Sequence, residues 1–228
     1  MIADKKLFFK GFGLLTAFTT VLIIMFIPLF QEGNALNYMD NLYNSISKNS
    51  AYYIPGLQEE NSTLQGTPVS MTLTLPTERR AEESVLLFEN AGAVVTRTGA
   101  DITLEGDIGL ILAAALADAD TMFHNRGAEI REKYGYGERQ VLFNWWTALN
   151  KADMALKKQK MFKEAKFVGN VNQRAIECAF NFYEITPQKI TDKIGIVVFS
   201  LVFYVIYTLW FGFSIMYLFE GWGMRLEH

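Results

Sequence analysis

Few residues of this chain are suited to catalysis or metal binding, and one pair has the spacing of metal ligands. Asp120 and His124 lie four positions apart, so on a helix they share a face and can hold a divalent cation, with Asp118 or Asn125 as a further ligand. The competing interpretation is an ordinary helix end, where His124 interacts with the C-terminal dipole and pairs with Asp120. We expect the helix end and keep the pair as the candidate metal site.

The other residue types with chemical potential argue against an enzyme. The chain has two histidines, one of them at its last position, and one cysteine. It contains no nucleophile elbow, phosphate-binding loop, dinucleotide motif or haem-attachment motif. Cys178 has no partner cysteine, and we expect it to be buried in a helix face rather than to bridge two subunits or anchor a cofactor. The prediction is a protein that is no enzyme and carries no cofactor.

A third set of residues has the character of a protein-binding surface. Trp145 and Trp146 are adjacent, so on a helix they point in different directions and only one of them fits a narrow core. Lys157 and Lys158 follow on the same predicted helix within a basic stretch, which is either a solvated face or a docking surface for an acidic partner or for anionic lipid. These four residues are the candidate partner-binding residues. The basic stretch comprises Lys151, Lys157, Lys158, Lys160, Lys163 and Lys166.

Two segments that are almost wholly apolar enclose these candidates. Residues 7–30 contain a single charge, Lys10, and residues 194–219 contain none. A helix of about 20 apolar residues crosses a bilayer, so each segment predicts a transmembrane helix. For the first segment the alternative is a cleaved signal peptide, but the apolar stretch is too long and no small-residue cleavage site follows it.

The distribution of lysines predicts the orientation of the two helices. Lys5, Lys6 and Lys10 stand at the start of the first segment, whereas residues 31–45 beyond it contain no Lys or Arg. Positive charge stays on the cytoplasmic side, so residues 1–6 and 220–228 are expected to be cytoplasmic tails. Residues 31–192 are then periplasmic or extracellular, and the predicted location is the bacterial inner membrane. The last residues, 226–228, resemble the start of an affinity tag.

Polar and aromatic residues recur at three- to four-residue spacing within the second apolar segment. Such groups prefer partners on a neighbouring helix when they lie in hydrocarbon, so they are predicted to make contact between transmembrane helices. They are Ser200, Tyr204, Tyr207, Thr208 and Phe211, and the first segment carries Thr16, Thr19 and Thr20.

The segment between the apolar helices predicts an α+β domain. Residues 37–48 have helical periodicity, and residues 69–75 alternate apolar and hydroxyl side chains as a strand does. A helix is expected from the N-cap Thr77 to Gly92, then a hairpin of residues 93–97 and 101–105, then a helix over residues 107–124. The order β-α-β-β-α predicts a sheet of about three strands with helices on one face.

Loops and long helices complete the prediction for this segment. Residues 52–56 and 65–68 contain Pro and Gly and are expected to be loops. Residues 138–185 are amphipathic and predict long helices, either two packed helices or one stalk, with an interruption at Gly169 and Asn170.

These features favour a membrane-anchored accessory or scaffold protein over two alternatives. In the favoured hypothesis the central domain assembles with itself or with a membrane complex, so the expected partners are the lipid bilayer and either further copies of the chain or other complex subunits. The order of helix, domain and helix also fits the input half of a transmembrane receptor. The third hypothesis is an oligomeric channel, although neither apolar segment has an ionisable residue at its centre. The nearly balanced charge, 21 basic against 24 acidic residues, predicts no nucleic-acid partner.

Overall fold

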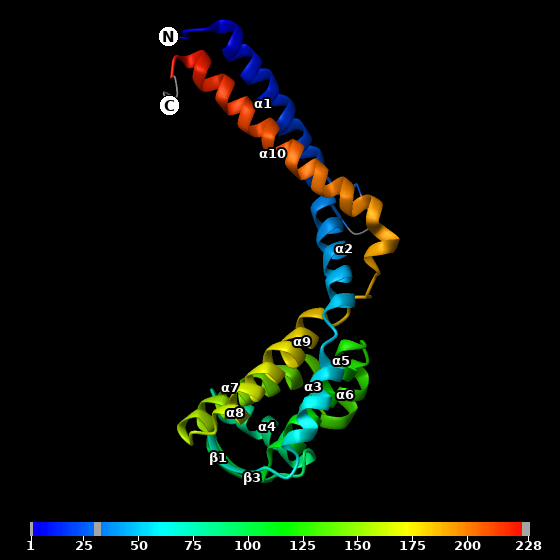
Figure 1. The fold of residues 1–228 in the computed structure, drawn as a ribbon, viewed down its shortest axis with the longest axis vertical. Helices are drawn as coiled ribbons and strands as arrows, with labels where there is room; N and C mark the ends of the chain where they lie inside the picture. The colour runs from blue at the N-terminus through cyan, green and yellow to red at the C-terminus, as the bar shows by residue number, and fades with distance from the viewer. Residues whose placement is uncertain (1, 30–32, 225–228) are drawn as a thin grey trace. The chain divides into compact units, whose positions relative to one another are not determined.

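The computed structural model describes residues 2–29 and 33–224 and divides the chain into two compact units (Figure 1). The helical unit consists of Met1–Asn49 and Pro187–His228, and the α+β domain consists of Ser50–Thr186. The predicted tag residues 226–228 lie outside the described residues.

The helical unit contains the two helices that are long and apolar enough to cross a membrane. Helix α1 spans Lys5–Phe26, where the Asp4 side chain accepts a hydrogen bond from the Leu7 backbone N–H as an N-cap. Helix α10 spans Ile194–Trp222 and follows the short 3-10 helix η3, Ile190–Lys193. By length and composition alone, both helices could cross a membrane. This agrees with the two apolar segments of the sequence. Helix α2, Ala35–Ser50, follows α1 in the same unit and includes the predicted helix over residues 37–48.

Helices α1 and α10 lie side by side (Figure 1). They pack through small and aromatic residues. Gly11 of α1 is buried against the α10 backbone. The Tyr207 hydroxyl donates to the Phe18 carbonyl at 3.3 Å, and the two rings stack with centroids 4.1 Å apart. The Trp210 indole N–H donates to the Leu14 carbonyl at 3.1 Å. Close backbone approach at small residues is the usual way in which helices associate in lipid.

The pairing of α1 and α10 is predicted to depend on Gly11 and not on Gly13. A Cβ atom at Gly11 would lie 2.6 Å from the Leu218 backbone nitrogen, whereas a Cβ atom at Gly13 meets nothing within 4 Å. Gly11→Ala should therefore separate the helices, and Gly13→Ala should not. The measurement is the yield of bismaleimide cross-linking between cysteines that replace Phe18 and Tyr207, in a Cys178→Ser background. Equal yields in the two variants would contradict the observed packing.

The α+β domain is built on a three-stranded antiparallel sheet. Strands β1 (Pro68–Thr74), β2 (Val94–Thr98) and β3 (Asp101–Asp107) are arranged in the order β1-β3-β2. Helix α4 (Glu78–Asn90) connects β1 to β2, and β3 is inserted between them, as in a split β-α-β unit. The predicted strand, the predicted hairpin and the helix capped by Thr77 are all confirmed.

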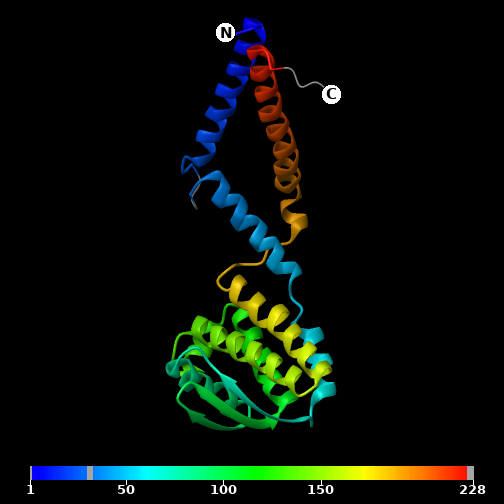
Figure 2. The same cartoon turned by 90° about the vertical axis from the view of Figure 1, so that its left-hand side faces the viewer.

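One face of the sheet is buried and the other is exposed. Inward residues such as Leu73, Ile102 and Leu104 are 0–1% exposed, while Thr72 and Thr103 point outward, with their hydroxyl oxygens 3.0 Å apart. The helices of the domain lie over one face of the sheet (Figure 2). This is the arrangement that period-two alternation in β1 predicts.

The other helices of the domain precede β1 or follow β3 in the sequence. They are α3 (Ile54–Asn61), the 3-10 helix η1 (Ser62–Leu64), α5 (Ile108–Phe123), α6 (Gly127–Tyr134), α7 (Glu138–Lys158), α8 (Phe162–Val171), the π-helix η2 (Asn172–Glu177) and α9 (Cys178–Phe182).

Two predictions about the helices are wrong. Residues 52–56 are not a continuous loop, because α3 begins at Ile54 and Pro55 occupies its first turn, where a proline costs no hydrogen bond. The long helical stretch is not interrupted at Gly169, which lies within α8. It breaks instead at Lys160, whose φ is +63°, and the Met161 backbone N–H bonds the Leu156 carbonyl across the turn. The alternative of two packed helices is confirmed by the contact between α7 and α8.

A buried carboxylate holds three helices of the domain together. Asp118 of α5 is 1% exposed and accepts hydrogen bonds from Lys133 Nζ at 2.8 Å, Tyr134 OH at 2.6 Å and Trp145 Nε1 at 2.8 Å. Burial and the neighbouring Asp118 raise the pKa of Tyr134 well above its ordinary value, so its hydroxyl remains a donor. The carboxylate thus joins α5, α6 and α7 at one point.

A second acidic group joins the start of α7 to α6 and to the end of the domain. Glu138 accepts hydrogen bonds from Arg131 Nε at 2.9 Å and Nη2 at 2.6 Å, and from Tyr183 OH at 3.2 Å. Its own backbone N–H, and then Arg131, lower the pKa of the Glu138 carboxyl below the ordinary range. A carboxyl of this kind binds fewer protons in the folded state than in the unfolded state, so it stabilises the domain above the ordinary glutamate pKa of about 4.3.

The domain should lose this stabilisation as pH falls below about 4.3, toward the lowered pKa of Glu138. In urea titrations, the free energy of unfolding should decrease between about pH 6 and about pH 3, and Glu138→Gln should make that decrease shallower. Glu129→Gln, which removes an exposed partner of Arg126, is the control. The expectation fails if both variants keep the slope of the unsubstituted protein.

Candidate functional site

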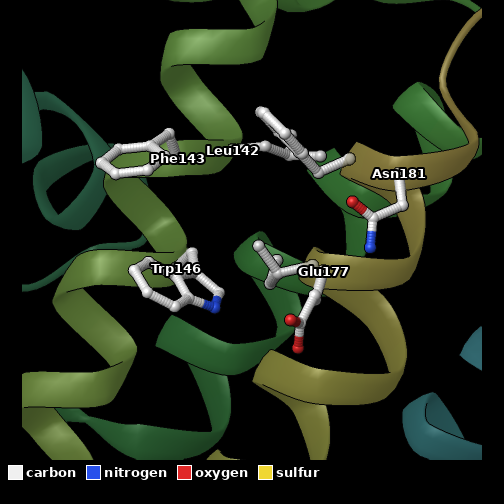
Figure 3. Close-up of a pocket in the computed structure, with 7 residues that line it drawn as sticks. Leu142, Phe143, Trp146, Glu177 and Asn181 are labelled. Carbon is white, nitrogen blue, oxygen red and sulfur yellow. The ribbon is translucent and has the colours of Figure 1, made fainter.

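A groove between α7 and the π-helix with α9 is the best candidate site in the described part of the α+β domain (Figure 3). Its volume is about 180 Å³. We call it the α7–α9 groove, and it is lined by Leu142, Phe143, Trp146, Ile176, Glu177, Phe180 and Asn181.

The two walls of the groove are held together by a side chain of the π-helix. Asn172 is buried, and its amide nitrogen donates to the Trp146 carbonyl at 3.1 Å. The π-helix that begins at this residue supplies Ile176 and Glu177 to the groove. π-helical turns are rare and occur frequently at functional sites, so the unusual backbone supports the choice of this groove.

The groove combines aromatic walls with polar groups on one side. Figure 3 shows Phe143 and Trp146 projecting from α7, and Glu177 and Asn181 from the facing helix. The indole nitrogen of Trp146 is turned toward the side of Glu177. Trp146 is 38% exposed, and within the described ranges its N–H and the carboxylate of Glu177 have no hydrogen-bond partner. Such a surface can bind an apolar or cationic group and orient it by hydrogen bonds.

The two adjacent tryptophans point in different directions, one into the core and one to the surface. Trp145 is 0% exposed, bonded to Asp118 and packed edge-on against Phe88. Trp146 lies at the surface with its ring 5.6 Å from the Phe143 ring. Trp145 therefore belongs to the core and is out of reach of a partner, and Trp146 is the tryptophan available for binding.

The predicted basic residues do not join the groove. Lys157 and Lys158 lie at the end of α7, roughly 16 Å along the helix from Trp146 at 1.5 Å per residue. Lys157 is paired with Asp153 at 2.7 Å. The turn at Lys160 places the later lysines on α8, so the basic stretch does not form a single helix face.

The candidate metal pair forms the helix end that we expected. His124 Nδ1 lies 3.4 Å from Asp120 Oδ1 and 2.9 Å from the Asp120 carbonyl oxygen. Tyr52 OH also donates to Asp120 at 2.6 Å, and burial together with this bond raises the pKa of Tyr52 to about 12. Asp118 faces the core instead of this pair. Among the described residues, no group of three or more His, Cys, Asp or Glu side chains is placed to hold a metal ion.

Cys178 is half-buried at the start of α9, and its thiol lies 3.4 Å from the Ala51 carbonyl oxygen. The expected burial of Cys178 in a helix face is therefore met in part, because the residue is neither fully buried nor exposed.

Of the residues of α10 that were predicted to contact another transmembrane helix, some contact α1 and the others do not. Tyr207 and Phe211 contact Phe18 of α1, while Tyr204 is 68% exposed. Ser200 bonds Tyr43 of α2 at 2.6 Å, and Thr208 bonds a carbonyl of its own helix. The hydroxyls of Thr16, Thr19 and Thr20 likewise donate to carbonyls within α1.

The sequence analysis missed six of the groove residues, namely Leu142, Phe143, Ile176, Glu177, Phe180 and Asn181. A partial signal exists, because Glu177 and Asn181 stand four apart and Phe180 lies between them. Nothing in the sequence indicates that this face meets Trp146, which lies about thirty positions earlier.

Comparison of the chain with protein-family models, with curated proteins and with solved structures gives no match. The interpretation of the groove therefore depends on its own geometry.

The two tryptophans should respond differently to truncation. Trp145→Ala removes a fully buried ring and a partner of Asp118, so it should destabilise the domain by about 3–5 kcal/mol. Trp146→Ala removes a surface ring and should cost about 1 kcal/mol or less. Urea unfolding followed by circular dichroism measures both. Similar losses in the two variants would show that Trp146 is a structural residue.

Proposed function

We propose that this protein is a non-enzymatic, membrane-anchored accessory or scaffold protein whose α+β domain docks on a protein partner. The observation that supports the proposal is the α7–α9 groove, with exposed Trp146, in a domain that lies between two apolar helices in the sequence. Tryptophan is among the residues that contribute most to binding at protein interfaces.

The proposed anchor consists of α1 and α10, with both chain ends in the cytoplasm. Lys5, Lys6 and Lys10 stand at the start of α1, and residues 31–45 contain no Lys or Arg, which favours this orientation by the positive-inside rule. The α+β domain then lies in the periplasm of a bacterial inner membrane, or outside the cell. The partner is a subunit of a membrane complex or a second copy of the chain.

The input half of a receptor is the second candidate, favoured by the order of helix, domain and helix. A receptor that senses a small solute and an accessory protein that binds another protein differ in what the groove would bind. Ligand pockets usually measure about 300–1,000 Å³, and the groove measures about 180 Å³. This size favours one side chain of a protein partner over a whole small molecule.

Photo-cross-linking in native membranes tests the proposed docking. A benzoylphenylalanine replacing Asn181, which lines the groove, should form a covalent adduct of defined mass with one partner. The same group replacing Met154, which is 54% exposed on α7 and does not line the groove, should not form that adduct. Mass spectrometry then distinguishes another protein from a second copy. If the protein is present in the membrane and neither position forms an adduct, the docking function is wrong.

A further inference from the structure

We propose that the α7–α9 groove receives the side chain of an arginine from the protein partner. This inference rests on the proposed docking function and specifies the chemistry of the partner. The arginine would lie along the Trp146 ring and direct its guanidinium to Glu177, which is the acidic side chain among the lining residues.

The aromatic rings of the groove indicate a cation. Phe143 already carries the guanidinium of Arg80 at 4.1 Å from its centroid, and Phe180 carries that of Arg139 at 5.8 Å. Within the described residues Trp146 has no cation over its ring, although tryptophan binds cations best among the aromatic residues. Arginine therefore lies over two of the three aromatic rings that line the groove, and Trp146 is the lining ring that has none in the described structure.

Charge complementarity indicates the same partner. Glu177 is exposed and has no ion-pair partner in the described part of the chain, whereas Arg139 near the groove is neutralised by Glu184 at 2.9 Å. Asn181 adds an amide oxygen on the same side of the groove. An incoming cation therefore meets an unpaired carboxylate and a second acceptor.

Arginine fits this surface better than lysine because its guanidinium is planar and weakly hydrated. It stacks on an aromatic ring and donates several hydrogen bonds in a fixed geometry, whereas an ammonium group is a compact and strongly hydrated charge. The groove offers one ring to stack on and two acceptors beside it, which is the arrangement that a planar donor can satisfy.

Fluorine NMR on the full chain in detergent micelles tests the inference directly. The four tryptophans are labelled as 5-fluorotryptophan, and the Trp146 signal is assigned with Trp146→Phe. The probes are N-acetyl-arginine methylamide, the matching citrulline compound, which is a neutral analogue, the lysine compound and the phenylalanine compound. The Trp145 signal reports whether each variant remains folded.

We expect the arginine probe to shift the Trp146 signal in a saturable way and the citrulline probe to shift it much less. Glu177→Gln should weaken arginine binding about five-fold, as expected for loss of an exposed ion pair. Glu132→Gln, an exposed carboxyl of α6 that does not line the groove, should leave it unchanged.

Three results would overturn the inference. They are no saturable shift with arginine, equal shifts with arginine and citrulline, and a stronger response to the phenylalanine or lysine probe. The probes act on purified protein and need no partner, so a failed inference leaves the cross-linking result intact. Conversely, if the arginine probe binds but no partner is cross-linked, the proposed docking function is wrong and the groove is only a cation-binding site.

Discussion

The hydrogen bonds to the buried side chain of Asp118 are the interactions on which the arrangement of helices α5, α6 and α7 depends. A polar side chain that is buried away from water needs hydrogen-bond partners, and Asp118 obtains three donors from α6 and α7. The bond from Trp145 lies on the buried face of α7, and this face sets the rotation of the helix about its own axis. Because consecutive residues are about 100° apart around a helix, the same rotation that turns Trp145 inward turns Trp146 outward. The exposure of Trp146 in the α7–α9 groove thus follows from the packing of the core.

The sequence predicts the sheet and its connecting helix well, because their signals are local. Alternation in β1, the Thr77 cap and Gly92 each act within a few residues. The elements that were missed depend on distant contacts or on atypical residues. The turn after α7 uses Lys160 at a positive φ, where a glycine would have been recognisable. The π-helix begins where Asn172 bonds Trp146 of α7, which lies 26 positions earlier in the sequence.

The candidate site was predicted only in part for the same reason. Adjacent tryptophans require that one of them leaves the core, so Trp146 was visible from the sequence. Its partners Glu177 and Asn181 come from another helix and could not be inferred without the packing of α7 against α9. Lys157 seemed equally suitable because charge can be read from the sequence, but the ion pair with Asp153 cannot.

The proposed function requires that α1 and α10 cross the membrane and that the α+β domain lies outside the cytoplasm. Single cysteines that replace Asp4 and the exposed Thr96, in a Cys178→Ser background, measure this in spheroplasts treated with a membrane-impermeant maleimide. In the proposed orientation, position 96 is labelled in intact spheroplasts and position 4 is labelled only after lysis. Labelling at position 4 but not at position 96 in intact spheroplasts, or release of the protein by alkaline carbonate, would contradict it.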